Sequence, residues 1–350
     1  MPDNGEGMKL YTKRDILKLT AAAALGTTVA AVEQIVQPGI AGEKPQPVPI
    51  PSEHQTPVPQ PTQTENTSIP TETPVSSRFD SLEGFSDEEK DLLKQHDIAA
   101  SLIEKGAVVR HEKYGDKTLL RLDYPKGNDH TLNFAKELSA YTAEAYPTLI
   151  TLPNGNKIMH MFMPGYICVS SSFMAVIEQH IAKKNPRLAT DICIPPIMLT
   201  EVVPNLDRDT ARNMYNKLSN EFAKYPERNR AIMSATATLL GDHTPGSRQG
   251  VIDILRNLGL ETTAELHLNT MSSDERRNKI LENQKKADYS ILVFNPRPGQ
   301  YVDHWINIVS PFENSSVSVI DDENAAKGIF NFKSTYLMDT SMSIVNITAT

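Results

Sequence analysis

The stretch Cys168-Val-Ser-Ser-Ser-Phe-Met-Ala-Val-Ile177 decides how this chain is organised, because it places a thiol at the head of an apolar run with helical character. The pair Pro164-Gly165 supplies a turn just before it. The unpaired N–H groups and the positive dipole end of a helix N-terminus stabilise a thiolate. We therefore expect a helix from Cys168 to about Lys184, with Cys168 as a candidate nucleophile.

Two later segments carry the groups that such a nucleophile needs. His304-Trp-Ile-Asn-Ile-Val309 is strand-like and begins 136 residues after Cys168, and Val317-Ser-Val-Ile-Asp321 is a short alternating strand that ends in a carboxylate. An imidazole can take the thiol proton and return it to the leaving group, while a carboxylate on the second ring nitrogen fixes the tautomer. The order Cys, His, Asp with this first spacing is the papain-type order.

Each of these residues also has a structural interpretation. A cysteine in an apolar run commonly packs as a small buried side chain. A histidine can be satisfied inside a sheet, and acids at a strand end are often ordinary turn residues. The candidate site therefore consists of three main residues and three alternative or assisting ones: Cys168, His304 and Asp321, then Asp322, Ser170 and Ser171.

Five segments in the same order resemble the C39-like branch of the papain-fold cysteine peptidases. They are Cys168–Ile177, Thr244–Leu260, Ser290–Pro296, His304–Val309 and Val317–Asp321. The resemblance covers about 160–325 and implies an α+β, papain-like fold whose nucleophile helix packs on a C-terminal antiparallel sheet. It also implies Cys168 as nucleophile, His304 as general base and then acid, and Asp321 as the orienting acid.

The sequence departs from that family pattern at three places. Val169-Ser170 replaces the Gly-Pro that follows the nucleophile, and Asp322 stands where the family has proline, which leaves Asp321 or Asp322 as the third member. Phe162 occupies the place of the oxyanion glutamine. The absence of such a hydrogen-bond donor lowers the reaction rate by a factor on the order of 10²–10³. The Cys168 N–H with a hydroxyl of Ser170 or Ser171 is one substitute. His160 is another, although Met159–Met163 is also typical of a plain strand.

The N-terminal 78 residues predict export and a spacer rather than chemistry. Lys13-Arg14 precedes an apolar, Ala-rich run to about residue 32, which resembles a twin-arginine signal with Lys13 in place of the first arginine. A general secretory signal, a buried helix and, if uncleaved, a marginal membrane anchor over 16–32 are the alternatives. Residues 44–78 contain nine prolines and predict a semi-rigid linker. The predicted units are thus 1–43, 44–78 and 79–350, the last with an N-terminal extension over 79–159 ahead of the family-like core.

Helices precede an antiparallel sheet in the predicted working domain, which is an α+β order. Expected helices, besides the Cys168 helix, span 86–104, 131–146, an insertion over 207–240, 247–258 and 272–286. Expected hairpins pair 107–110 with 118–123 and 149–152 with 157–162. The closing strands are expected at 289–294, 305–309, 317–320, 328–332 and 343–348.

Composition excludes several function classes. The net charge of −8 argues against a nucleic-acid partner, and two cysteines are too few for a disulfide framework or a thiolate zinc site. No dinucleotide or metal-helix motif is present, so we expect no cofactor. We expect an exported thiol hydrolase acting on a peptide or protein substrate. The alternatives are a non-catalytic envelope domain, which a Cys168–Cys193 disulfide would favour, and an acyltransferase with the same triad.

Overall fold

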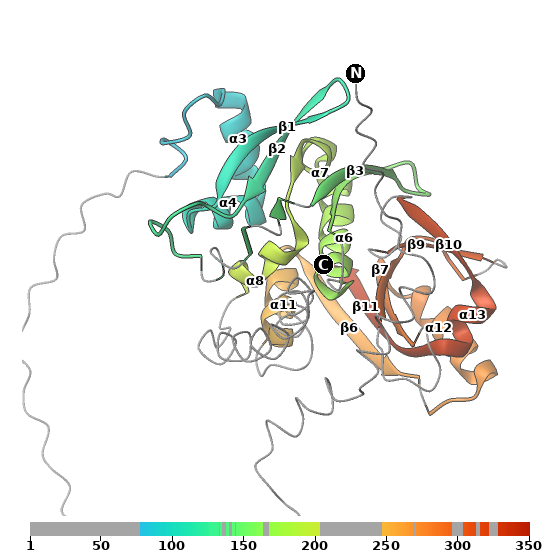
Figure 1. Cartoon of the computed structure of the whole chain (residues 1–350). Coiled ribbons are helices and arrows are strands. Elements are labelled where there is room, and N and C mark those ends of the chain that lie inside the picture. Colours follow the sequence, from blue (N-terminus) through green and yellow to red (C-terminus); the bar gives the residue numbers. More distant parts are fainter. Residues whose placement is uncertain are drawn as a thin grey trace, which may run out of the picture. The chain divides into compact units, whose positions relative to one another are not determined.

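Mixed α and β elements make up the folded part of the chain, with short helices and hairpins preceding a larger sheet (Figure 1). The computed structural model describes residues 78–132, 134, 138–139, 142–143, 145–163, 168–203, 247–268, 270–295, 304–312, 316–321 and 328–350. All of them belong to one unit, Ser77–Thr350. The predicted export signal, the linker up to residue 77 and the predicted insertion over 207–240 lie outside the described residues.

The first helical segment is divided into α3 (Asp87–Gln95) and α4 (Asp97–Glu104), whereas the sequence predicted one helix. Ser86 and Glu89 form a capping box at the start of α3. His96 causes the division, because its extended backbone ends α3 while its Nδ1 accepts the Ala99 N–H at 3.3 Å and so caps α4. One residue therefore ends one helix and begins the next.

Two hairpins follow and agree with the predicted ones. Strands β1 (Val108–Tyr114) and β2 (Lys117–Asp123) pair antiparallel, and β3 (Tyr146–Thr151) pairs with β4 (Lys157–Phe162). The predicted helix over 131–146 is wrong at both ends, since residues 131–132 are not helical and Tyr146 already belongs to β3. Pro147 lies inside this strand, where its missing N–H is tolerated in a two-stranded sheet.

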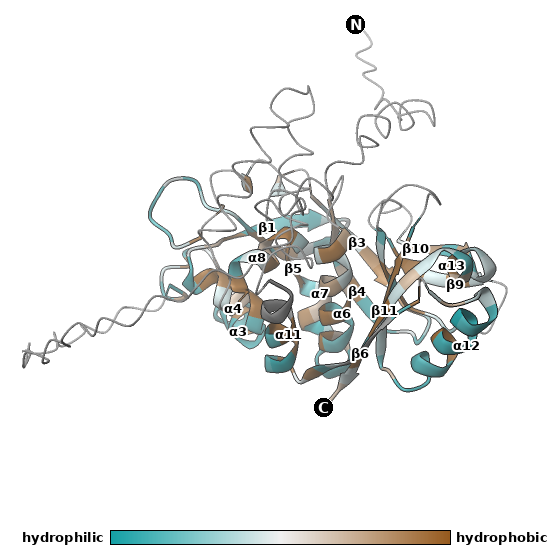
Figure 2. Cartoon of the chain, turned by 90° about the horizontal axis from the view of Figure 1, so that it is seen from below, coloured by the Kyte–Doolittle hydropathy of each residue, from teal (hydrophilic) through white to brown (hydrophobic). Residues whose placement is uncertain are grey.

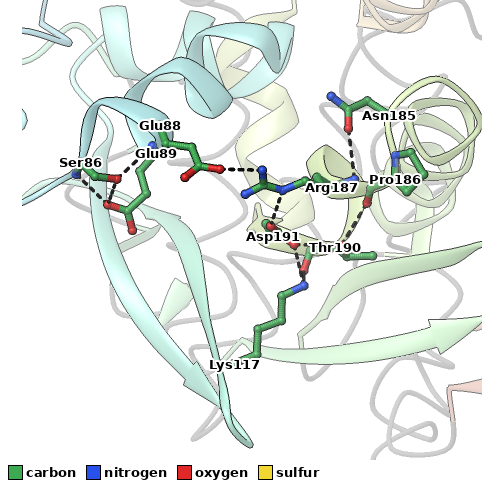
Figure 3. Close-up of polar contacts among 9 residues, drawn as sticks. All are labelled: Ser86, Glu88, Glu89, Lys117, Asn185, Pro186, Arg187, Thr190 and Asp191. Atoms are coloured by element: carbon green, nitrogen blue, oxygen red, sulfur yellow. Dashed lines mark hydrogen bonds and ion pairs between the residues drawn. The ribbon is translucent and has the colours of Figure 1, made fainter.

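A polar network joins α3, β2 and α7 (Pro186–Asp191), as Figure 3 shows. Arg187 Nη1 donates to Glu88 Oε1 at 2.7 Å, and Lys117 Nζ donates to Asp191 Oδ1 at 2.5 Å. Asn185 caps α7 through the Arg187 N–H at 3.2 Å. Most of these side chains are substantially exposed, so the network sets the relative placement of the three elements more than it adds stability.

Helix α6 (Cys168–Lys184) is the central element and has the predicted bounds. Every residue from Val169 to Ala182 is buried, which explains why its sequence lacks a polar stripe. It packs against β4, α7 and the sheet strand β8 (His304–Ile308), and both views show it between the β1–β2 hairpin and the sheet (Figures 1 and 2). The short elements β5 (Ile192–Cys193), η1 (Pro196–Met198) and α8 (Leu199–Val202) follow α7.

The C-terminal sheet is antiparallel, with the strand order β10-β9-β8-β7-β11-β6. The remaining bounds are β6 Leu260–His267, β7 Tyr289–Phe294, β9 Ser316–Ile320, β10 Ile329–Lys333, β11 Ser341–Ala349, α11 Ser247–Asn257, α12 Ser273–Gln284 and α13 Ser334–Thr340. The five predicted closing strands are confirmed to within one or two residues. The sequence prediction missed β6 and α13.

The two faces of this sheet are covered differently. One face carries a core to which α12 and α13 contribute: Leu268, Ile280, Leu292, Phe294, Ile306, Ile308, Phe312, Val317, Val319, Leu337, Met338 and Ile344. The outer side of α12 is mostly hydrophilic (Figure 2), in keeping with its highly charged sequence. Helix α6 covers the other face. In the described part of the chain, no helix is both long and apolar enough to cross a membrane.

Candidate functional site

His304 and Asp321 form a buried pair at one end of the sheet. His304 Nε2 and Asp321 Oδ1 share a hydrogen bond of 2.7 Å, and the two residues are 6% and 2% exposed. The pairing of Asn307 with Ile320 places Asp321 opposite Ile306, so Asp321 is the diagonal neighbour of His304 on the same face. The sheet register therefore brings the two side chains together.

The aromatic ring of Phe294 closes one side of this pair. Phe294 lies directly opposite His304 in the β7–β8 register, and the two rings meet edge to face with centroids 5.4 Å apart. Phe294 is itself 1% exposed and belongs to the sheet core. Such a dry setting strengthens the interaction between imidazole and carboxylate, because the local dielectric is low.

Cys168 is the first residue of α6 and is half-buried. The structure contains no disulfide between Cys168 and Cys193, both of which are described. Burial raises the pKa of Cys193 to about 12, so this second thiol is neutral and inert at physiological pH. Of the two thiols, Cys168 alone combines a helix N-terminus with access to solvent.

Two contacts fix the direction of α6 on β8. The rings of Phe173 and Trp305 have centroids 6.1 Å apart, and Gln179 Nε2 donates to Asn307 Oδ1 at 2.6 Å. Residue numbers therefore rise in the same direction along the helix and along the strand. Since Cys168 begins the helix and His304 begins the strand, both lie toward the same end of the α6–β8 contact.

The strand also determines how Cys168 can approach His304. Successive side chains of a strand point to opposite faces, and Trp305 and Asn307 face α6. The ring of His304 lies on the other face, with Phe294. A direct meeting of the Cys168 sulfur with the His304 ring therefore has to occur around the N-terminal end of β8.

The bond to Asp321 also assigns the ring nitrogens. Because Nε2 of His304 is bonded to Asp321, a proton exchanged with Cys168 has to pass through Nδ1. Asp322, the alternative third member, lies outside the described residues. The described geometry thus joins Asp321 to His304.

The two candidate serines are buried in the first turn of α6. Ser170 is 0% and Ser171 is 3% exposed. The Ser171 hydroxyl is bonded to His160 Nε2 at 3.0 Å, and His160 Nδ1 is bonded to Glu178 Oε2 at 2.6 Å. The structure therefore places Ser171 and His160, two separate candidates for oxyanion donors, in one hydrogen-bonded chain.

Glu178 is the member of this chain that the sequence interpretation missed. A signal was present, because a lone acid in the apolar run of α6 must be either paired or neutral once the helix is buried. Burial raises the pKa of Glu178, while the attraction of His160 opposes the shift. His160 lies on β4, inside the stretch predicted as a plain strand, and this strand is confirmed.

Phe162 stands at the position where the resemblance predicts a polar oxyanion donor. It is 0% exposed and meets the ring of His160 edge to face, with centroids 4.8 Å apart. Its partners are thus structural, and its side chain offers no hydrogen bond. The backbone N–H groups at the start of α6 are the remaining donors that sequence and structure together suggest.

No protein-family model matches this chain, and no curated protein shows significant similarity to it. Among the described residues, no three His, Cys, Asp or Glu side chains are grouped so that they could hold a metal ion.

Proposed function

We propose that this protein is an exported thiol hydrolase that cleaves peptide or amide bonds with Cys168, His304 and Asp321, on a papain-like variant of the α+β fold. The observation that carries the proposal is the buried His304–Asp321 hydrogen bond of 2.7 Å, which lies at the same end of the α6–β8 contact as the N-terminus of α6. A histidine oriented by a buried acid and a thiol at a helix start are the groups that thiol acyl transfer requires.

In the proposed reaction, Nδ1 of His304 takes the Cys168 proton and the sulfur attacks the carbonyl carbon of the scissile amide. The tetrahedral oxyanion collapses, the C–N bond breaks, and the imidazolium protonates the leaving amine. Water then attacks the thioester with His304 as base, which releases the acid and restores the thiol. Asp321 holds the tautomer and stabilises the imidazolium throughout.

The backbone N–H groups at the N-terminus of α6 are the proposed donors to the oxyanion. Phe162 supplies none, so the site has fewer side-chain donors than the family pattern. We therefore expect the turnover rate to be lower than that of papain-type enzymes with the side-chain donor, by a factor of up to roughly 10²–10³.

Alkylation and acylation of the full chain test the proposal. Iodoacetamide should label Cys168 faster at pH 7 than it labels an unstructured peptide thiol, and His304→Gln or Asp321→Ala should slow this labelling at least roughly tenfold. Cys193, buried with a pKa of about 12, is an internal control that should react only after unfolding. Equal rates in the wild type and in both variants would overturn the proposal.

A second readout separates the two alternative functions. With p-nitrophenyl acetate as acyl donor, a hydrolase or transferase should release a burst of p-nitrophenolate that is lost in Cys168→Ala, whereas a non-catalytic domain should release none. Added glycinamide would then distinguish transfer from hydrolysis, because only a transferase forms the acetylated amine in preference to acetate. The buried Phe162 is the observation that favours the non-catalytic alternative.

A further inference from the structure

A second histidine–acid pair lies against the nucleophile helix, and the proposed Cys–His–Asp chemistry does not use it. His160 of β4 bonds Glu178 through Nδ1 at 2.6 Å and Ser171 through Nε2 at 3.0 Å. The three residues are 0%, 6% and 3% exposed. They form a hydrogen-bonded chain, sealed from solvent, that has the connectivity of a Ser–His–acid relay.

Helical periodicity puts this chain next to Cys168. Ser171 follows Cys168 by three residues and Glu178 follows Ser171 by seven, so the three side chains share one side of α6. Residues three apart on a helix have Cβ atoms roughly 5–6 Å apart. Ser171 is thus the member of the chain nearest to Cys168.

Glu178 is the charge in direct contact with His160. The elements packed against β4 are α6, α7, β3 and β5. Outside α6, their charged or titratable side chains in the described ranges are Tyr146, Arg187, Asp191 and Cys193. Arg187 and Asp191 are paired with Glu88 and Lys117, and Cys193 is neutral. Among these groups, Glu178 is therefore the charged side chain that contacts His160 directly.

The proton count of this pair fixes the direction of the Ser171 hydroxyl. With Glu178 ionised and His160 neutral, the Nδ1 proton is donated to Glu178 and Nε2 accepts the Ser171 O–H. After uptake of one proton, whether it resides on the imidazole or on the carboxyl, Nε2 carries the proton and donates to Ser171 Oγ. The Ser171 O–H then points elsewhere. Burial, which raises the pKa of Glu178, favours this uptake.

We propose that His160 and Glu178 act through Ser171 as positioning residues for Cys168. When the pair takes up a proton, the Ser171 hydroxyl turns away from His160 and donates to the Cys168 thiolate. This inference rests on the proposed thiol function, because it describes how a second group tunes the same nucleophile. It assigns the Cys168 sulfur two polar partners, His304 and Ser171.

The pH profile of Cys168 alkylation tests this role. In the full chain, Ser171→Ala should lower the iodoacetamide rate at pH 6 roughly tenfold, the effect of losing one hydrogen bond to a charged group, and leave the rate at pH 9 unchanged. A merely structural defect would change the rate at both pH values. Ser171→Ala removes a single oxygen atom, so this variant is expected to fold.

A double-variant cycle tests the route through Ser171. In the His160→Gln background, Ser171→Ala should change the rate by the same factor at pH 6 and at pH 9, because no titrating partner then changes the direction of the Ser171 hydroxyl. His180→Gln is the matched control, because His180 is a buried histidine of α6 that contacts Leu258 and Tyr289 instead, three turns beyond Cys168. Independent, additive effects of Ser171→Ala and His160→Gln would overturn the inference.

The outcomes also separate this inference from the proposed function. If His304→Gln leaves Cys168 alkylation unchanged, the proposed function fails. If His304→Gln slows alkylation but Ser171→Ala gives the wild-type profile from pH 5 to pH 9, the thiol function stands and the His160–Glu178 role is wrong.

Discussion

His96 should make the stability of this domain depend on pH in a window that one substitution can remove. The side chain is 4% exposed, and burial lowers its pKa from 6.5 to about 4. Its Nδ1 accepts the Ala99 N–H and caps α4, which requires a neutral ring. Protonation therefore both charges a buried group and breaks the helix cap.

The sign and size follow from linkage. The unfolded chain takes up a proton on this histidine near pH 6.5 and the native state only near pH 4, so the native state loses relative stability as pH falls through this interval. A pKa difference of this size corresponds to about 3 kcal/mol. Above pH 6.5 the full contribution is present.

His96→Asn isolates this contribution, because asparagine caps helices well and does not titrate. Urea unfolding at pH 7 and at pH 4 should show the wild type losing about 3 kcal/mol more than the variant between the two values. Groups that titrate in both proteins cancel in this difference. His96→Ala, which lacks the cap as well, should be less stable than His96→Asn by about 1 kcal/mol at both pH values. An equal loss in the wild type and His96→Asn would refute the reasoning.

Two further predictions concern stability and are checked by urea unfolding at pH 7. Gly106→Ala should destabilise the domain clearly more than Gly84→Ala. Both glycines have a positive φ, in which an alanine is strained by roughly 1–2 kcal/mol. A Cβ at Gly106 would in addition lie 2.5 Å from His130 Cβ, whereas a Cβ at Gly84 would have nothing within 4 Å. Equal losses would contradict this. Arg121→Met should lower the free energy of unfolding by about 3–5 kcal/mol, because the buried Arg121 donates to Asp123 and to backbone carbonyls. Arg187→Met, in the exposed network of Figure 3, should leave the urea midpoint unchanged. The reverse order would sink the argument.

The candidate site divides between what local sequence signals can reveal and what they cannot. The helix at Cys168, the strand at His304 and the strand before Asp321 were all predictable, because turn residues and apolar periodicity act over a few residues. Their bounds in the structure agree with the prediction to within a residue. The diagonal register that joins His304 to Asp321 depends on how two strands pair, so the sequence alone could not establish it.

The misplaced elements failed for identifiable reasons. His96 reads as an ordinary helical position, but its burial and its bond to Ala99 N break the segment in two. Within the predicted helix over 131–146, the described residues 138, 139 and 142 are helical, but Tyr146 pairs with Phe162 across a hairpin, and this pairing overrides local propensity at the end of the segment. The polar sequence of β6 is stabilised by its neighbour β11 rather than by its own pattern.

The sequence by itself determined the α+β order of elements and the chemical identity of Cys168, His304 and Asp321, because residue type and short-range periodicity are local properties. Only the tertiary structure decided that α6 runs parallel to β8, that His304 faces away from the helix, and that Ser171, His160 and Glu178 form one chain. Burial and strand register arise from contacts between residues far apart in the chain. The proton that a buried imidazole holds depends on those contacts, and no single segment of the sequence contains them.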